Sequence, residues 1–305
     1  MAVIAVEHLT KDYGHRRGCF DVSFHVNDGE VYGFLGPNGA GKTTAIRHML
    51  GFLKPDKGGV SINGKGAWDY AHELNANIGY IPGEINFPDK ITGMELIKWM
   101  ADMRGTKSLT KAKELLDFFE LDPSGETKRM SKGMKQKVGI VCALMHDAGI
   151  LILDEPTSGL DPLMQEKFIE LIRSEQAAGR TVLMSSHMFP EVEKTCDRVG
   201  IIKQGEIVTE VAMDDITKSK DKVFKVKFDT AGESQRIARE HRELDFAEIN
   251  HEKNRVKIKV NDKDINTVTG LLSNYEIQYL TEEKLTLEDY FMKFYSSKNQ
   301  VKGGK

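Results

Sequence analysis

The residues with the clearest chemistry lie in one short segment near the start of the chain. Residues 36–44 are Gly36, Pro37, Asn38, Gly39, Ala40, Gly41, Lys42, Thr43 and Thr44. They match the pattern G-x-x-x-x-G-K-[ST], in which glycines let backbone N–H groups wrap around an oxyanion at a helix N-terminus. Lys42 supplies a charge for the β- and γ-phosphates, and the Thr43 hydroxyl is a ligand for Mg²⁺. The segment therefore predicts a nucleoside triphosphate site rather than a glycine-rich turn that merely opens a helix.

Two acidic residues follow an apolar segment further along the chain. Residues 150–153 are apolar, and Asp154 and Glu155 come directly after them. This pattern is typical of a strand that is buried on both faces and reaches a site at its C-terminal end. Asp154 is predicted to hold Mg²⁺, directly or through water, and Glu155 to polarise the attacking water. The structural alternative is a pair of acids that only caps the following helix.

The elements that would position these residues alternate between strands and helices. Residues 31–35 form a predicted buried strand before the loop, and residues 45–50 have helical spacing after it. Residues 3–9 and 20–26 alternate between apolar and polar types, as in strands of an antiparallel or mixed sheet. From about residue 89 to 145 the spacing is helical. The predicted fold class is α/β: a P-loop ATPase core with an antiparallel β subdomain and a helical insertion.

The composition is that of a soluble globular protein with room for two domains. Of the 305 residues, 40% are hydrophobic and 29% are charged, and the net charge of −3 gives no reason to expect nucleic-acid binding. Cys19, Cys142 and Cys196 lack metal-ligand spacing and suit a reducing cytoplasm. No apolar run reaches about 20 residues, the length of a membrane span, and the N-terminus lacks a signal-peptide pattern. If the protein works at a membrane, we expect it on the cytoplasmic face, with another protein spanning the bilayer.

Several blocks of the chain together resemble the ATP-binding subunit of ABC transporters. Residues 130–137 are similar to the LSGGQ signature of that family, and residues 158–161 resemble its D-loop. Tyr13 stands where the family has an aromatic residue that stacks on adenine, and His187 where it has its switch histidine. With the phosphate loop and the two acids, these blocks follow the family's order over about 70% of the chain.

The resemblance implies an active site that is shared between two subunits. Tyr13 would stack on the base, and His187 would sense the γ-phosphate of the ATP bound to its own chain. Ser131, Gly133 and Asp161 would contact the ATP of a second subunit, so that two chains enclose two nucleotides. The implied cofactors are ATP and Mg²⁺. The implied partners are a second ATP-binding subunit, in a homodimer, and a separate transmembrane permease.

Two motifs depart from the family pattern. Gly83 stands where a glutamine is expected to touch Mg²⁺ and the attacking water, and the neighbouring Glu84 is either a replacement ligand or a solvated acid. In the signature, Lys132 replaces a glycine and Met134 replaces a glutamine. Lys132 either adds charge near the triphosphate or lies at the surface. Both variants resemble those of ABC-2-type exporter ATPases, which narrows the predicted branch.

The pattern changes after residue 216, so residues 1–216 are predicted to be the ATP-binding domain. Residues 217–222 form a charged linker, and residues 223–305 have the order βαββαβ, typical of a small ferredoxin-like α+β domain. A last helix is predicted to pack on the domain's own core through an apolar stripe. The stripe consists of Leu287, Tyr290, Phe291 and Phe294. Regulation, support of the dimer and partner selection are open roles for this domain.

Taken together, these patterns predict the ATP-hydrolysing subunit of a membrane exporter, peripheral on the inner face of the cell membrane. It would dimerise around two ATP molecules, touch the membrane only through its permease and bind no nucleic acid. One alternative is a soluble ABC-type ATPase that acts on ribosomes or DNA, although the second cassette or long coiled coil of such proteins is not found. The other is a P-loop kinase or GTPase switch, against which the signature and D-loop count. The transported substrate and the identity of the second ATPase subunit stay open.

Overall fold

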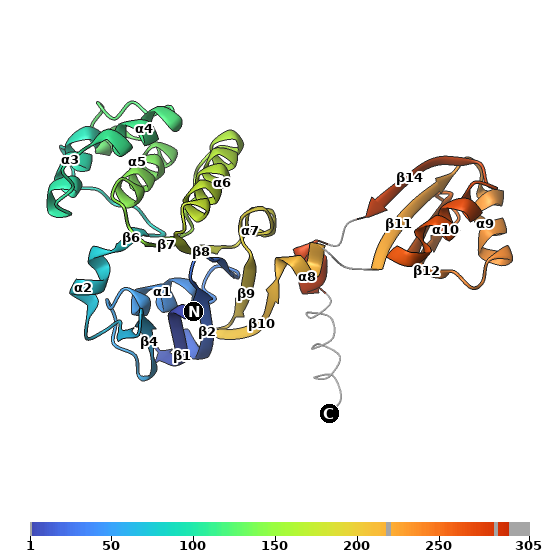
Figure 1. Cartoon of the computed structure of the whole chain (residues 1–305), viewed down its shortest axis with the longest axis horizontal. Coiled ribbons are helices and arrows are strands. Elements are labelled where there is room, and N and C mark those ends of the chain that lie inside the picture. The colour runs from blue at the N-terminus through green and yellow to red at the C-terminus, as the bar shows by residue number, and fades with distance from the viewer. Residues whose placement is uncertain (1, 218–220, 284–285, 293–305) are drawn as a thin grey trace. The chain divides into compact units, whose positions relative to one another are not determined.

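The chain packs into two units. The computed structural model describes residues 2–217, 221–283 and 286–292. The first unit is Met1–Ala212 and the second is Met213–Lys305, as the colours from blue to red in Figure 1 allow the reader to follow. The predicted linker contains residues 218–220, which lie outside the described residues. No helix of the described part is both long and apolar enough to cross a lipid bilayer.

A six-stranded sheet in the first unit carries the site. Its order is β10-β9-β3-β8-β7-β6, and all neighbours run parallel except β9 and β10. The strands are β3 (Val31–Leu35), β6 (Ile78–Ile81), β7 (Ile150–Asp154), β8 (Thr181–Ser186), β9 (Arg198–Lys203) and β10 (Glu206–Ala212). Every residue of β3, β7 and β8 is buried, because a central parallel strand is covered on both faces. The carboxyl ends of these three strands meet at one edge, where the phosphate loop and the two acids lie.

A second, antiparallel sheet of four strands shares a core with the first. Its order is β2-β1-β4-β5. The strands are β1 (Ala2–Asp12), β2 (Gly18–Asn27), β4 (Lys57–Ile62) and β5 (Lys65–Gly66). The Phe24 ring on β2 stacks on Tyr32 of β3 with centroids 5.0 Å apart, which joins the two sheets. Helices α1 (Lys42–Met49), α2 (Ala71–Ala76), α6 (Pro162–Ala177) and α7 (Phe189–Thr195) complete this part of the unit.

A group of helices separates β6 from β7 in the chain. They are α3 (Gly93–Met103), α4 (Thr110–Phe118), the short η1 (Thr127–Arg129) and α5 (Lys132–Leu144). Helix α5 packs against α3 and α4 on one side and against β6 on the other, and Figure 1 shows the three helices together. A capping box starts α3, since the Thr92 hydroxyl accepts from the Glu95 N–H and the Glu95 carboxylate accepts from the Thr92 N–H. This insertion places the start of α5 near the sheet edge.

The second unit begins with α8 (Met213–Thr217) and contains a βαββαβ domain. Its elements are β11 (Asp221–Phe228), α9 (Ala231–Glu240), β12 (Asp245–Asn250), β13 (Arg255–Asn261), η2 (Asp262–Asp264), α10 (Ile265–Leu272) and β14 (Ile277–Glu283), with sheet order β12-β13-β11-β14. Alternate residues of β11 and β13 point to a core shared with α9 and α10. Residues 287–292 are helical with Leu287 buried, whereas Phe294 of the predicted stripe lies outside the described residues. The predicted fold class, including the ferredoxin-like unit, is confirmed.

Candidate nucleotide-binding site

The phosphate loop connects the buried strand β3 to helix α1. The Gly36 N–H donates to the carbonyl oxygen of Ser186 at 3.1 Å, so the loop starts from the neighbouring strand. Gly41 precedes α1 with φ at 107°, in the left-handed range that favours glycine. A Cβ at this position would lie 2.6 Å from the Gly18 carbonyl oxygen. The close approach of two backbones therefore requires glycine at position 41.

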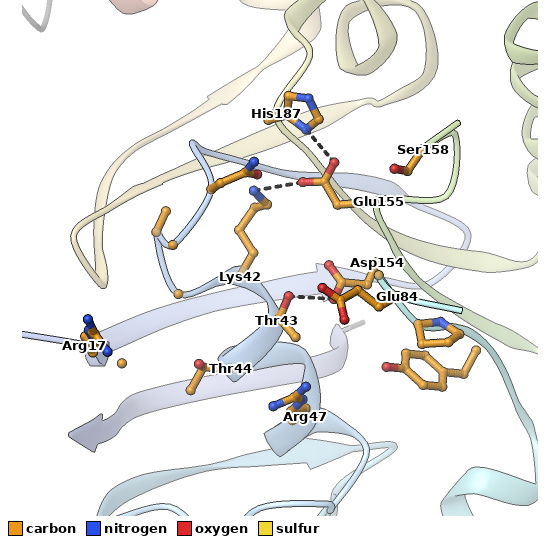
Figure 2. Close-up of a pocket in the computed structure, with 18 of the residues that line it drawn as sticks. Arg17, Lys42, Thr43, Thr44, Arg47, Glu84, Asp154, Glu155, Ser158 and His187 are labelled. Carbon is orange, nitrogen blue, oxygen red and sulfur yellow. Dashed lines mark hydrogen bonds and ion pairs between the residues drawn. The ribbon is translucent and has the colours of Figure 1, made fainter. Parts of the chain in front are cut away.

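The Lys42 ammonium lies inside the loop. Its Nζ donates to the Gly36 carbonyl oxygen at 2.6 Å and forms a 3.0 Å ion pair with Oε1 of Glu155, as Figure 2 shows for the second contact. Nζ also lies 3.4 Å from the Pro37 carbonyl oxygen. Lys42 is only 5% exposed, and a charge in such a poorly solvated place interacts with phosphate more strongly than in water.

Thr43 and Asp154 bring two oxygen ligands together. Thr43 Oγ1 donates to Asp154 Oδ2 at 2.7 Å, and Ser185 Oγ donates to Oδ1 at 2.5 Å. Ser185 is the register partner of Asp154 across β7 and β8, so the sheet itself places this hydroxyl. Mg²⁺ is usually bound through one or two carboxylates, water and substrate phosphates, which this pair fits. Within the described residues, no group of three or more His, Cys, Asp or Glu side chains could hold a metal.

Glu155 lies between a lysine and a histidine. Its Oε1 pairs with Lys42, and its Oε2 lies 2.5 Å from Nδ1 of His187 (Figure 2). The Glu155 backbone has φ at 50°, which is uncommon for a residue other than glycine and is stabilised here by hydrogen bonds from its N–H to Ser185. A carboxylate held by two partners at the end of a parallel strand is arranged to orient and polarise a water molecule.

Tyr13 lies in the turn between β1 and β2, beside a cavity that the phosphate loop also lines. Its ring is half exposed and lines the cavity, as stacking on a base requires. The Tyr13 N–H donates to the Arg17 carbonyl oxygen at 2.9 Å, which closes the turn and brings the Arg17 side chain to the same cavity. Arg47 of α1 also lines it. Sequence reasoning missed both arginines, although Arg47 follows Thr43 by four residues, about one helical turn.

The cavity has a volume of about 980 Å³, enough for a nucleotide. Tyr13 and residues 38–44 line it, together with Asp154, Glu155 and His187. Gly36 and Pro37 contribute instead through the carbonyl oxygens that face Lys42. Tyr80 also lines the cavity, and burial, with Asp154 nearby, raises the pKa of its phenol to about 12, so it stays a neutral hydroxyl. Most of the residues that were predicted to contact ATP or Mg²⁺ thus line one cavity.

Ser131, Gly133 and Asp161 lie at the N-termini of two helices and do not line the cavity of their own chain. Ser131 Oγ and Asp161 Oδ1 each accept a hydrogen bond from the N–H three residues later, at 3.2 and 3.0 Å. A Cβ at Gly133 would lie 2.7 Å from the Gly159 carbonyl oxygen, so the signature packs closely on the D-loop. These residues are placed by helix capping and backbone packing.

Each of the two motifs that depart from the family pattern has residues at the cavity: Gly83 and Glu84 in one, and Lys132 in the signature. A Cβ on Gly83 would lie 3.0 Å from Asp154 Oδ2, so the Gly83 backbone packs directly against the predicted Mg²⁺ ligand. Glu84 is exposed, lines the cavity and forms no hydrogen bond or ion pair in the described part of the chain. Lys132 is exposed and also lines the cavity, and its Nζ donates to the Ser158 hydroxyl at 2.7 Å. Lys132 therefore joins the signature to the D-loop.

The chain is similar to proteins of one family over nearly its whole length. Residues 19–158 match the family model described as ABC transporter. The bacitracin transport ATP-binding protein BcrA of Bacillus licheniformis is 32% identical over 95% of this chain and 96% of its own length. The linearmycin resistance ATP-binding protein LnrL of Bacillus subtilis (strain 168) is 35% identical over 68% of each chain.

Solved structures agree with this assignment. A structure described as the ATP-binding subunit of an ABC transporter has a TM-score of 0.64 and 33% identity, over 71% of this chain and 92% of its own. A bacterial ABC transporter cassette, MJ0796, described as dimeric, has a TM-score of 0.63 at 24% identity, over 69% of this chain and 98% of its own, and shows the same fold. The predicted family is confirmed, in place of a kinase or GTPase switch. The chain belongs to the ATP-binding, ATP-hydrolysing subunits of ABC transporters.

Proposed function

We propose that this chain dimerises around two ATP molecules and powers a separate permease that exports its substrate. The observation that carries the proposal is the position of Ser131 and Gly133, which lie outside the cavity formed by the phosphate loop of their own chain. A second subunit would supply its signature to that cavity, and both signatures would be used in a twofold dimer. The names of the relatives, which refer to bacitracin transport and linearmycin resistance, support export.

The proposed chemistry gives a role to each of the residues gathered at the sheet edge. Lys42 holds the β- and γ-phosphates, and Thr43 and Asp154 hold Mg²⁺, which supplies positive charge to the phosphate oxygens when bound. Glu155 polarises the attacking water, and His187 holds the Oε2 side of that carboxylate and senses the γ-phosphate. Because Lys42 and Glu155 form an ion pair, the phosphate-binding cation and the water-activating acid lie at the same end of the cavity.

The proposal also covers Glu84, Asp161, the division of the chain into domains and its place in the cell. Glu84 completes the ligands around Mg²⁺ or its water, because Gly83 leaves no side chain there and Glu84 lines the same cavity. Asp161 contributes to the nucleotide of the second subunit. Residues 1–216 form the ATP-binding domain and residues 223–305 the accessory domain. The protein acts on the inner face of the cell membrane through its permease.

The shared site is tested with two variants, each of which is expected to be inactive as a homodimer. Lys42→Ala removes the charge from both phosphate loops of a homodimer, and Ser131→Arg blocks both signatures, so each purified variant should be inactive. In a mixed heterodimer, one site carries both defects and the other has an intact loop and an intact signature. We expect ATP hydrolysis above that of either variant alone, measured as phosphate release from heterodimers verified by crosslinking.

The matched control mixes Lys42→Ala with Glu155→Gln. Both changes affect residues that act on the nucleotide of their own chain, so each site of this heterodimer keeps one defect and no activity should return. Rescue of the first mixture but not the second supports the shared site. Absence of rescue in crosslinked heterodimers of the first mixture would contradict it.

A further inference from the structure

Three consecutive polar residues, the last two of β8 and the residue that follows it, each bond a different carboxylate. Ser185 Oγ donates to Asp154 Oδ1 at 2.5 Å, and His187 Nδ1 lies 2.5 Å from Glu155 Oε2. Both carboxylates line the nucleotide cavity. The residue between the two, Ser186, makes a third bond of this kind, and its partner acid lies outside that cavity.

That partner is Glu191, in the first turn of α7. Ser186 Oγ donates to Glu191 Oε2 at 2.5 Å and accepts a hydrogen bond from the Met188 N–H at 3.0 Å. The Ser186 hydroxyl therefore bridges the turn that contains His187, and the Glu191 carboxylate fixes the position of this hydroxyl. Ser186 is 1% exposed and Glu191 is 6% exposed, so water does not compete for these bonds.

A buried carboxyl group at this position lowers the stability of the fold unless its polar atoms are paired. Glu191 forms no ion pair with any described residue, and burial raises the pKa of its carboxyl although the hydroxyls of Ser186 and Thr157 act in the opposite direction. An apolar side chain of similar volume would fill the same space without burying a polar group. It would, however, leave the Ser186 hydroxyl without its acceptor and the His187 turn without that support.

We infer that Glu191 is a positioning residue for ATP hydrolysis. It fixes the Ser186 hydroxyl, which fixes the Met188 N–H and so the turn that holds His187 against Glu155. Glu191 touches neither the nucleotide nor the reacting atoms. The inference rests on the proposed role of His187, and it needs only an acceptor at position 191, because Ser186 is the donor.

The experiment measures kcat and KM for ATP of the full-length chain with five changes. Glu191→Leu removes the acceptor, and we expect kcat to fall about tenfold to a hundredfold while KM changes less than about threefold, since the nucleotide contacts remain. Glu191→Gln keeps an acceptor oxygen and should retain kcat within about threefold. Glu193→Leu, on the same helix, is the matched control and should behave as wild type.

A double variant that combines His187→Ala with Glu191→Leu shows whether Glu191 acts through His187. His187→Ala should lower kcat, and adding Glu191→Leu to it should lower kcat by less than about twofold more, because the group that Glu191 positions is already absent. An equal loss with and without His187, or no loss for Glu191→Leu alone, would overturn the inference and leave the role of His187 intact. A wild-type kcat for His187→Ala would overturn both.

A second variant keeps the test decisive if Glu191→Leu does not fold. Ser186→Ala removes the link itself and should lower kcat as Glu191→Leu does, again only while His187 is present. Thermal unfolding and the Kd for ATP identify a folded variant. A folded Ser186→Ala protein with wild-type kcat would overturn the inference.

Discussion

The two units of the chain place their charged side chains in opposite ways. In the first unit, Lys42, Asp154 and Glu191 are buried and each is held by hydrogen bonds or an ion pair. In the described part of the second unit, Ser234 is the only buried residue among serines, threonines, amides and charged types. Buried polar groups destabilise a fold unless they are paired. Of these three residues, Lys42 and Asp154 line the nucleotide cavity, so the paired buried charges of the first unit include part of the proposed site.

The second unit carries its charges on the open face of its sheet. Val226 and Val256 point to the core, whereas Lys225 stands directly opposite Lys257 across β11 and β13, and Lys227 stands opposite Arg255. Like charges in directly opposed positions destabilise a sheet. Glu248 and Glu283 on the two edge strands pair with Lys257 and offset part of this repulsion. Charge at an exposed surface therefore does not by itself indicate a site.

The largest effect should come from a change in Glu155, the partly buried carboxylate that is proposed to act on water. Glu155→Gln keeps the size of the side chain and removes its basicity, so kcat should fall by about 10² to 10⁴ while the Kd for ATP changes little. The variant should also accumulate as an ATP-bound dimer, measured by gel filtration. Glu276→Gln, on the exposed surface of the second unit, is the control and should leave kcat unchanged. Hydrolysis at the wild-type rate would remove Glu155 from its proposed role.

A smaller effect is expected where a buried hydroxyl supports a buried carboxylate. Ser185→Ala leaves Asp154 Oδ1 without its donor, so the first unit should lose about 1–3 kcal/mol of its free energy of unfolding. Trp68 and Trp99 both lie in the first unit, so tryptophan fluorescence in urea reports on it alone. Ser234→Ala in the second unit is the matched control, because it also removes a buried hydroxyl but should not shift this fluorescence transition. An unchanged midpoint for Ser185→Ala would contradict the expectation.

The exposed acid at the cavity should have an effect on turnover and none on stability. Glu84→Ala should lower kcat about tenfold and leave the Kd for ATP within about twofold, if the carboxylate orients Mg²⁺ or its water. The comparison is with Glu73→Ala, an exposed acid of the same unit that pairs with Lys65 away from the cavity. Equal kcat values for the two variants would make Glu84 a solvated surface acid.

Much of the site could be predicted because its residues occur in contiguous motifs. Lys42 and Thr43 follow the apolar strand β3, and the two acids lie at the end of the apolar strand β7. The parallel sheet brings the ends of these strands together. Ser185 and Glu191 were missed because their roles depend on contacts across the fold. The register of β7 against β8 places Ser185 beside Asp154, and the turn into α7 brings Glu191 under Ser186.

In the second unit, the sequence allowed the fold to be predicted but no site. Alternation in β11 and β13 predicted the strands, because one face of a two-layer domain is buried and the other is not. The opposition of Lys225 to Lys257 was not predicted, since β11 and β13 are separated in sequence by α9 and β12 and their register is fixed by the shared core. Neither the alternation in β11 and β13 nor the opposed lysines indicate a ligand. The fold of this unit could therefore be predicted, whereas its function could not.

The smallest expected effect tests the repulsion on that open face. Lys225 forms no ion pair in the described part of the chain, and its neighbour across the sheet is Lys257. Lys225→Glu replaces a like-charge pair by an opposite-charge pair, so the second unit should gain about 0.2–1 kcal/mol of stability. Because neither tryptophan lies in this unit, its unfolding is followed by circular dichroism in urea and compared with the fluorescence transition.

Salt and a control substitution separate this effect from a general change in charge. Screening weakens interactions between exposed charges, so the gain from Lys225→Glu should shrink in about 1 M salt, where the Debye length is about 3 Å. Lys253→Glu makes the same change of charge in the turn between β12 and β13, where Lys253 has no opposed strand partner, and should change stability by less than about 0.5 kcal/mol. If both variants gain equally, net charge rather than the opposed pair sets the stability of the sheet. A gain confined to Lys225→Glu at low salt would show that the second unit retains an unfavourable arrangement of charges with no buried chemistry to explain it.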